Sequence, residues 1–304
     1  MDIQLRSEAP GDEDAIDIVN CRGFESMNEA NIIRLMRMYS PAFDPKYSIA
    51  AWDGDRIVGH ALFTPATIRL MDQTVKALAL GPIAVLPERQ RSGIGGRLIR
   101  HGHDLGRRAD FSLAFLYGHP SYYPRHGYLP CFGFGKAKID VEKLPPATQK
   151  FHRMPVRPDD VHWLAERHAA ELAGVDFGWM WGPNPGEWAI PCLNSVMWWT
   201  DDGRRAAYTL GVPRRGTRLL LADDPELARE VIATLRPAAL DHHPSGWLAR
   251  NVLDPKWSTC EASRHDAAMA FELQEGVLEP YLKAVEAGGR PPGFAMFPLP
   301  FIAC

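Results

Sequence analysis

An apolar strand that runs into a glycine-rich turn and a basic helix constrains this chain more than any other feature. Residues 78–86, LALGPIAVL, are almost continuously apolar, as expected for a central strand buried on both faces. Three glycines follow between residues 93 and 96, and apolar residues then recur at helical spacing from Ile94 to Ala109. A strand, a short turn and a helix in this order predict a mixed α/β fold.

The same junction is suited to bind a phosphate. Glycines leave room for backbone N–H groups to converge, and a helix N-terminus carries about half a positive charge. Residues 89–108 contain six arginines and one acid, Asp104. No Gly-Lys-Ser/Thr follows, and the glycine order is not that of a dinucleotide-binding turn. A glycine turn followed by a solvated basic helix face is the alternative interpretation.

The rest of the first half alternates between helical and extended patterns. Apolar spacing predicts two helices, at 12–19 and 32–39. Polar turns between alternating segments predict hairpins over 47–63 and 68–85, and a further strand over 111–117.

Two blocks of this half resemble a known family. The string 87–99, PERQRSGIGGRLI, resembles motif A of the GCN5-related N-acetyltransferases (GNAT), in which Gln/Arg-x-x-Gly-x-Gly/Ala wraps the pyrophosphate of acetyl-coenzyme A (acetyl-CoA). The string 116–128, LYGHPSYYPRHGY, resembles the Gly-Asp-Pro-x-Tyr-Tyr-x-x-x-Gly-Phe block of a compact bacterial branch, with His119 in place of Asp and Tyr128 in place of Phe. The resemblance covers about residues 1–140 and implies a GNAT-type mixed central sheet flanked by helices.

The resemblance also implies that acetyl-CoA is the co-substrate. The residues expected to bind it lie at the strand end and in the turn after it: Ile83, Ala84, Val85, Gln90, Arg91, Ser92, Gly93, Ile94, Gly95 and Gly96. By the same resemblance, Ile83 and Val85 act through main-chain groups, because a backbone N–H can stabilise the oxyanion of acyl transfer.

Tyr123 aligns with the tyrosine that acts as general acid in this family, protonating the departing thiolate. Packing in a short helix is its alternative role. The general base is less well specified. His119 at a strand end and His60 in a hairpin strand are candidates, each with a purely structural alternative, and a water chain would also serve.

The second half has no comparable motif. Residues 1–150 have a net charge of +2 and residues 151–304 a net charge of −5, and a Pro-containing stretch at 143–150 separates them. We therefore predict a catalytic domain over 1–145 and a second α+β domain over 152–304. Its order of strands and helices echoes the first half, so it is expected to be a degenerate GNAT copy, with an unrelated capping domain as the alternative. Its tryptophans predict core or interdomain packing, with an acceptor pocket as the alternative.

Composition excludes several classes. With 34 Lys+Arg against 37 Asp+Glu, the chain lacks the basic balance of a nucleic-acid-binding domain. Five cysteines without a CxxC pair argue against a disulfide scaffold and fit the cytoplasm. His101/His103 and His242/His243 lack zinc-site spacing, so no metal is expected. No apolar run is long enough to span a membrane, and no signal peptide is expected.

The sequence thus predicts a cytoplasmic N-acetyltransferase that moves an acetyl group from acetyl-CoA to a primary amine of a small molecule. A protein N-acetyltransferase and a non-catalytic acyl-CoA sensor are the alternatives. The apolar tail 291–304 is expected to pack on the body of the protein or on a partner chain, so a homodimer is left open.

Overall fold

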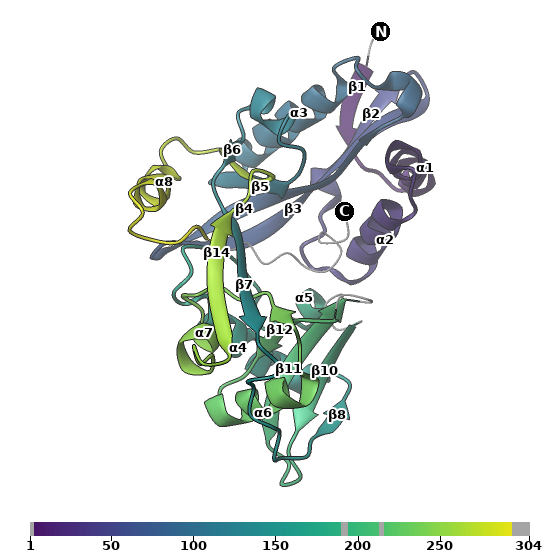
Figure 1. Ribbon diagram of the computed structural model, residues 1–304. Coiled ribbons are helices and arrows are strands. Elements are labelled where there is room, and N and C mark those ends of the chain that lie inside the picture. Colours follow the sequence, from purple (N-terminus) through teal and green to yellow (C-terminus); the bar gives the residue numbers. More distant parts are fainter. Residues whose placement is uncertain (1–2, 190–193, 213–215, 294–304) are drawn as a thin grey trace.

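The computed structural model describes residues 3–189, 194–212 and 216–293, and it has an upper and a lower lobe (Figure 1). The upper lobe contains an eight-stranded sheet. Its strands from the first half of the chain are β1 (Ile3–Ser7), β2 (Ser48–Asp53), β3 (Arg56–Leu70), β4 (Gln73–Val85), β5 (Leu113–Tyr117) and β6 (Leu129–Pro130). β4 and β5 pair in parallel, and the other neighbouring strands of the sheet are antiparallel. The expected α/β class, with a mixed sheet flanked by helices, is confirmed.

Three helices cover the two faces of this sheet: α1 (Glu13–Phe24), α2 (Asn28–Tyr39) and α3 (Ile94–Arg108). Successive residues of a strand point to opposite faces. A Cβ on Gly59 of β3 would touch Ile94 and Leu98 of α3, whereas the ring of the next residue, His60, contacts Asn20 of α1. The α1–α2 pair and α3 therefore lie on opposite faces.

The lower lobe repeats the first strand order on a smaller scale. Its four-stranded sheet has the order β8-β10-β11-β12, with every neighbour antiparallel, as in β1-β2-β3-β4. The strands are β8 (His152–Met154), β10 (Ser195–Trp199), β11 (Arg205–Val212) and β12 (Gly216–Leu221). The helices of the second half are α4 (Val161–Leu172), α5 (Pro185–Ala189), α6 (Pro225–Leu235), α7 (Trp247–Asn251) and α8 (Glu279–Glu286).

Strands of the second half complete the first sheet. β9 (Phe177–Met180) pairs with the far end of β3, and β15 (Ala268–Glu272) lies between β5 and β6. A third sheet joins the lobes, with β7 (Gly133–Ile139) between β13 (Ala239–Leu240) and β14 (Ser258–Arg264). The division into domains 1–145 and 152–304 stays a prediction. β9 and β15 follow residue 152 in the chain, yet they pair with strands of the first half.

Aromatic packing fixes the junction between the halves. Phe115 of β5 contacts the rings of Phe177 and Trp179 edge-on, with centroids 6.0 and 5.4 Å apart. Trp181 stacks on the buried His168 at 4.8 Å, and Trp188 meets both rings edge-on. Aromatic side chains bury large apolar areas, so this cluster stabilises the fold.

Candidate active site

β4 and β5 separate near the middle of the first sheet. They pair only where Ala77–Ala79 faces Leu113–Phe115. Beyond this point β4 stays beside β3, while β5 continues beside β15. The β3–β4 register shifts between Leu80 and Ile83 of β4. The sheet therefore opens between residues 80–85 and the end of β5.

A cavity of about 1290 Å³ occupies this opening. The residues expected to bind the co-substrate line it, except Ser92, whose Oγ donates to the Arg89 carbonyl oxygen at 2.5 Å. Tyr123 and His119 line it as well. The structure thus brings the expected binding and catalytic residues to one place, while their roles stay predictions.

The N-terminus of α3 presents backbone donors to this cavity. Gly93 is the N-cap at φ +82°, a left-handed conformation that favours glycine, and no described side chain caps the helix. The first N–H groups of a helix have no acceptor within the helix. Gln90 holds the turn against β4, because its Nε2 donates to the Val85 carbonyl oxygen at 3.2 Å. This arrangement fits a phosphate group.

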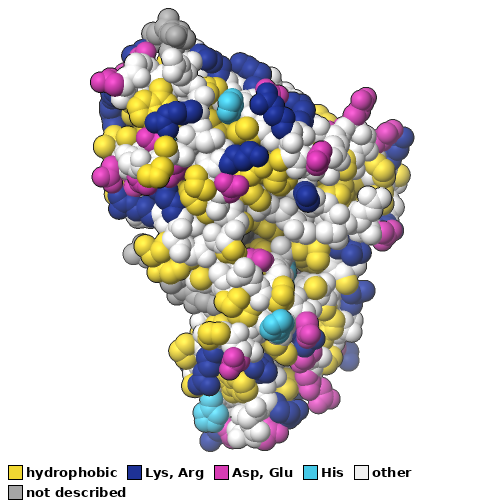
Figure 2. All heavy atoms as spheres, turned by 180° about the vertical axis from the view of Figure 1, so that it is seen from behind, with side chains coloured by type: hydrophobic (Ala, Val, Ile, Leu, Met, Phe, Trp, Pro, Cys, Tyr) yellow, Lys and Arg dark blue, Asp and Glu magenta, His cyan; other side chains and the backbone are white. Residues whose placement is uncertain are grey.

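Cationic side chains surround the same end of the cavity. Arg91, Arg100 and Arg125 line it, are exposed, and form no ion pair with an acid in the described part of the chain. Seen from behind, Lys and Arg side chains gather on the upper lobe, to which α3 belongs (Figure 2). Burial lowers the pKa of the nearby His126, and Arg100 and Arg125 lower it further. Anions are therefore attracted here and a proton on His126 is disfavoured.

The equivalent helix of the second half has the opposite chemistry. α6 follows β12 as α3 follows β4, but its N-cap is Asp224, whose side chain accepts from the N–H groups of Glu226 and Leu227. A carboxylate thus occupies the donors that remain available on α3. A phosphate would meet repulsion at this position.

Tyr123 lies beside the end of β5. It begins the short 3₁₀ helix η3 (Tyr123–His126), and its half-buried ring meets Tyr122 edge-on at 5.2 Å and Tyr128 at 5.8 Å. Tyr122 also lines the cavity, where a Cβ on Gly95 would come within 2.5 Å of its hydroxyl oxygen. The two tyrosines therefore point to different parts of the site, Tyr122 toward the start of α3.

The departure from the family pattern at Tyr128 has an internal explanation. Its hydroxyl lies 2.9 Å from Nε2 of His103, and the His103 ring stacks on Phe271 of β15 at 4.0 Å. Burial lowers the pKa of His103 to about 3 and raises the pKa of Tyr128 well above 10. His103 is thus neutral, and the Tyr128 hydroxyl can donate to it.

The two histidines considered as bases occupy different environments. His119 is exposed on the cavity wall, and its carbonyl oxygen accepts from the N–H of Tyr122 at 3.0 Å. His60 is fully buried, away from the cavity lining, between Asn20 and Ser48 at 3.1 and 2.9 Å. Burial lowers its pKa to about 3. His60 is therefore part of the core.

The other end of the cavity contains residues that sequence reasoning missed. Glu29, Phe24 and Ile32 come from the α1–α2 corner, and Tyr117 comes from the end of β5. His265 comes from the second half, with Nε2 3.4 Å from the Tyr117 hydroxyl oxygen. An acidic first helical turn is the only signal that could have drawn attention to Glu29. Nothing in the sequence places His265 beside Tyr117.

The described residues also contain no group of three or more His, Cys, Asp or Glu arranged to hold a metal ion. No helix among them is long and apolar enough to cross a membrane.

Comparisons with known proteins agree with this geometry. A model of the GNAT acetyltransferase domain matches residues 6–131. The uncharacterized N-acetyltransferase YjhQ of Escherichia coli (strain K12) is 41% identical over 123 residues, which are 40% of this chain and 67% of that protein. The uncharacterized N-acetyltransferase YhbS of the same organism is 26% identical over 124 residues, 41% of this chain and 72% of that protein.

One solved structure extends the likeness of fold to most of the chain. A GCN5-related N-acetyltransferase from Kribbella flavida covers 91% of this chain and 73% of its own, with a TM-score of 0.67 at 18% identity. The enzyme class expected from the sequence, an acyl-CoA-dependent N-acetyltransferase, is confirmed. Two motifs in order, a sheet that opens behind them and a relative 41% identical lead to one conclusion: the chain belongs to the GNAT acetyltransferase family.

Proposed function

We propose that this protein transfers an acetyl group from acetyl-CoA to the primary amine of a small molecule. The observation that carries this proposal is the cavity, which passes between β4 and β5 and has the free N-terminus of α3 at one end. A diphosphate fits that end, and an acceptor fits the other. The thioester would then lie in the opening of the sheet, beside main-chain groups of residues 80–85.

The reaction needs three contributions from the protein: stabilisation of the oxyanion, a proton for the departing thiolate, and removal of a proton from the acceptor ammonium. The amine nitrogen attacks the thioester carbonyl carbon, the C–S bond breaks, and an amide and a thiol form. A backbone N–H of β4 stabilises the oxyanion, and we assign this role to Ile83 or Val85. The hydroxyl of Tyr123 donates a proton to the departing thiolate.

The position of Tyr123 supports its role as general acid. Its ring lies against the end of β5, where the opening begins, and it lines the cavity. A phenol has a pKa of about 10 and therefore holds its proton at neutral pH, so it has a proton to give as the C–S bond breaks and negative charge develops on the sulfur.

An alkylammonium must lose a proton before its nitrogen can attack. His119 is exposed at the same end of β5, and we propose that it accepts this proton, directly or through water. His60 is not a candidate, because it lies outside the cavity lining and is fully buried.

The second half supports a small acceptor. His265 and Ala267 line the cavity, so this half closes one side of the acceptor end. A broad peptide would need an open groove at this position. We further propose that the lower lobe is a degenerate GNAT copy that does not bind acetyl-CoA, because Asp224 occupies the donors of α6. A cytoplasmic location and a homodimer stay predictions.

The decisive experiment measures thiol release from acetyl-CoA with a panel of small amines and with peptides bearing a free N-terminus or lysine. Turnover with small amines, and little with peptides, is expected. Preference for peptides would favour a protein N-acetyltransferase. Tight acetyl-CoA binding with no turnover on either set would favour an acyl-CoA sensor and contradict the proposal.

A further inference from the structure

The two ends of the cavity lie on opposite faces of the sheet. α3, with Gly95 and Gly96 on the cavity wall, covers the face to which Gly59 points. Glu29 belongs to α2, which lies with α1 on the other face. Tyr117 points to that same face, because it lies three residues after Ala114, which pairs with Leu78 beside Gly106 of α3, and its ring contacts Phe134 of β7. We call these the α3 end and the α2 end.

The charge of the two ends differs. The α3 end carries Arg91, Arg100 and Arg125. At the α2 end Glu29 lines the wall together with the apolar Phe24 and Ile32. A negative group can therefore be held at the α3 end, whereas the α2 end favours a positive one.

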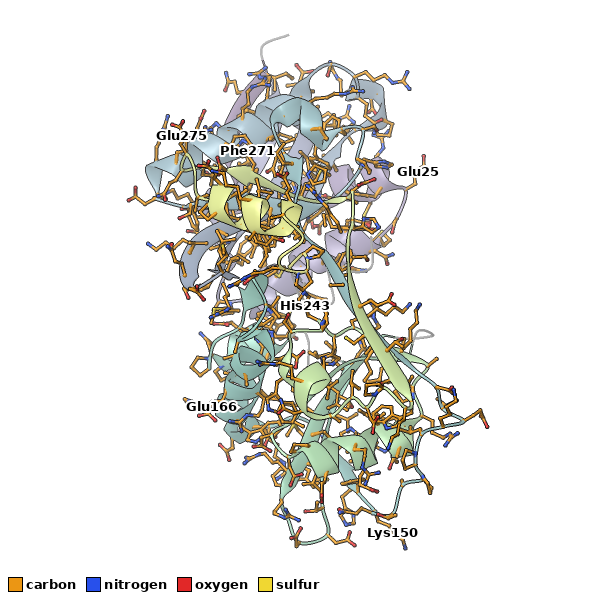
Figure 3. All side chains as sticks on the ribbon, turned by 60° about the vertical axis from the view of Figure 1, so that its left-hand side comes forward. Glu25, Lys150, Glu166, His243, Phe271 and Glu275 are labelled. Atoms are coloured by element: carbon orange, nitrogen blue, oxygen red, sulfur yellow. The ribbon has the colours of Figure 1, made fainter. Side chains whose placement is uncertain are left out.

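Glu29 is placed to act on whatever occupies this end. It lies in the first turn of α2, and only 4% of its surface is exposed to solvent. Interactions of a charge strengthen where water is excluded, because the local dielectric is low. Glu25, four residues earlier, is exposed and projects from the surface of the upper lobe (Figure 3).

The remaining wall favours a flat apolar body. The ring of Tyr117 meets His265 with centroids 5.2 Å apart, and Phe134 packs edge-on against Tyr117 at 5.5 Å. Tyr117 is 40% exposed, so part of its ring remains available to a ligand. Aromatic rings pair well with other rings and with cations.

We propose that Glu29 determines acceptor specificity: it binds the ammonium form of a small arylalkylamine and excludes amines that also carry a carboxylate. The inference rests on the acetyl transfer proposed above. The acceptor ammonium still loses one proton to His119 or water before attack. Glu29 is thus a binding residue, distinct from the proton donor Tyr123.

Two probes that differ by one carboxylate test this assignment. Thiol release is measured for the full chain with phenethylamine and with phenylalanine. The wild type is expected to prefer phenethylamine in kcat/KM by at least about 10-fold. Hydrogen bonds to charged groups are worth about a 10- to 100-fold change, so E29Q should lower kcat/KM for phenethylamine by that factor. The loss should lie mainly in KM for the amine, with KM for acetyl-CoA unchanged.

Specificity separates a binding role from a structural one. A merely destabilised E29Q would lose activity on both amines equally, whereas loss of the charge should collapse the preference for phenethylamine. E25Q should keep the wild-type preference, and E29D, which retains the charge, should keep most of it. If E29Q does not fold, the wild type is assayed with phenylalaninamide, which lacks the carboxylate charge of phenylalanine and should be accepted nearly as well as phenethylamine.

Three results would overturn the inference. An unchanged preference in folded E29Q, or a wild type that rejects phenylalaninamide as strongly as phenylalanine, would remove Glu29 from acceptor recognition while leaving acetyl transfer intact. A wild type that accepts phenylalanine as well as phenethylamine would do the same. Absence of thiol release with every amine would overturn the proposed function and this inference together.

Discussion

Gly118 leaves the space that the ring of Tyr123 fills. A Cβ at position 118 would lie 2.2 Å from Cε2 of Tyr123, closer than any real contact allows. Gly118 follows the last residue of β5, so the strand end itself sets the position of the tyrosine. The glycine of the second sequence block thus has a packing reason.

Gly118→Ala should therefore move the Tyr123 ring. We expect kcat to fall by about 10-fold or more, because a displaced acid transfers its proton poorly. Affinity for acetyl-CoA, measured by calorimetry, should change little. Gly289→Ala is the control, since its nearest contact would be an ordinary 3.9 Å. Unchanged kcat in Gly118→Ala would show that the ring position is not critical.

Tyr123→Phe removes only the hydroxyl. General acid–base catalysis contributes about 10²- to 10⁴-fold, so single-turnover transfer should slow by that range. Single-turnover rates are the proper measurement, because slow product release can hide a chemical defect. Tyr39→Phe, on an exposed part of α2 outside the cavity lining, should be neutral. Wild-type chemistry in Tyr123→Phe would direct attention to His119.

Gly93→Asp should abolish acetyl-CoA binding. The new carboxylate would lie at the start of α3 and repel the diphosphate, and a side chain is strained at the positive φ of this position. Gly203→Asp is a matched control, because Gly203 also has positive φ, +80°, and open space around a Cβ. Calorimetric affinity equal to wild type in Gly93→Asp would refute the assignment. Wild-type affinity should also weaken with salt.

Buried neutral histidines predict acid sensitivity. Burial lowers the pKa of His60, His103 and His168 to about 3, from an ordinary 6.5. Between pH 3 and pH 6.5 the unfolded state therefore binds more protons than the folded state. The free energy of unfolding is thus highest above pH 6.5 and falls as the pH drops toward 3. Each contributes at most about 1.4 kcal/mol per pH unit.

Urea unfolding at several pH values measures this slope. His168→Gln should make the slope shallower, whatever its effect on stability at pH 7. His162→Gln, exposed on the same helix, should leave the slope unchanged. A flat profile between pH 6.5 and 5 would contradict the assignment of neutral buried rings.

Limited proteolysis should cut the chain between residues 143 and 155. Residues 145–150 are exposed and outside helices and strands, although the N–H groups of Thr148 and Gln149 donate to Glu230 at 2.6 and 3.0 Å. Glu230→Gln should speed cleavage. The two fragments should stay together in gel filtration, since β9 and β15 pair with strands of the other fragment. Cuts confined to other places would refute the linker.

The sequence predicted the elements that local patterns encode. The hairpin between β3 and β4 and the helix α3 after its glycine turn both depend on neighbours within a few residues, and both are confirmed. The insertion of β15 beside β5 depends on pairing partners about 150 residues apart, which no local pattern records. For the same reason His265 could not be placed at the cavity.

The insertion of β15 also governs when the protein can fold during synthesis. One edge of β5 has no partner until Ala268–Glu272 have been made, although Tyr117 was added long before. At about 5–20 residues per second, the ribosome needs roughly 8–30 s to cover that stretch. A nascent chain therefore carries an open apolar edge throughout this interval. Truncation before Ala268 would leave every molecule in that state, and we expect such fragments to aggregate rather than to act as smaller enzymes.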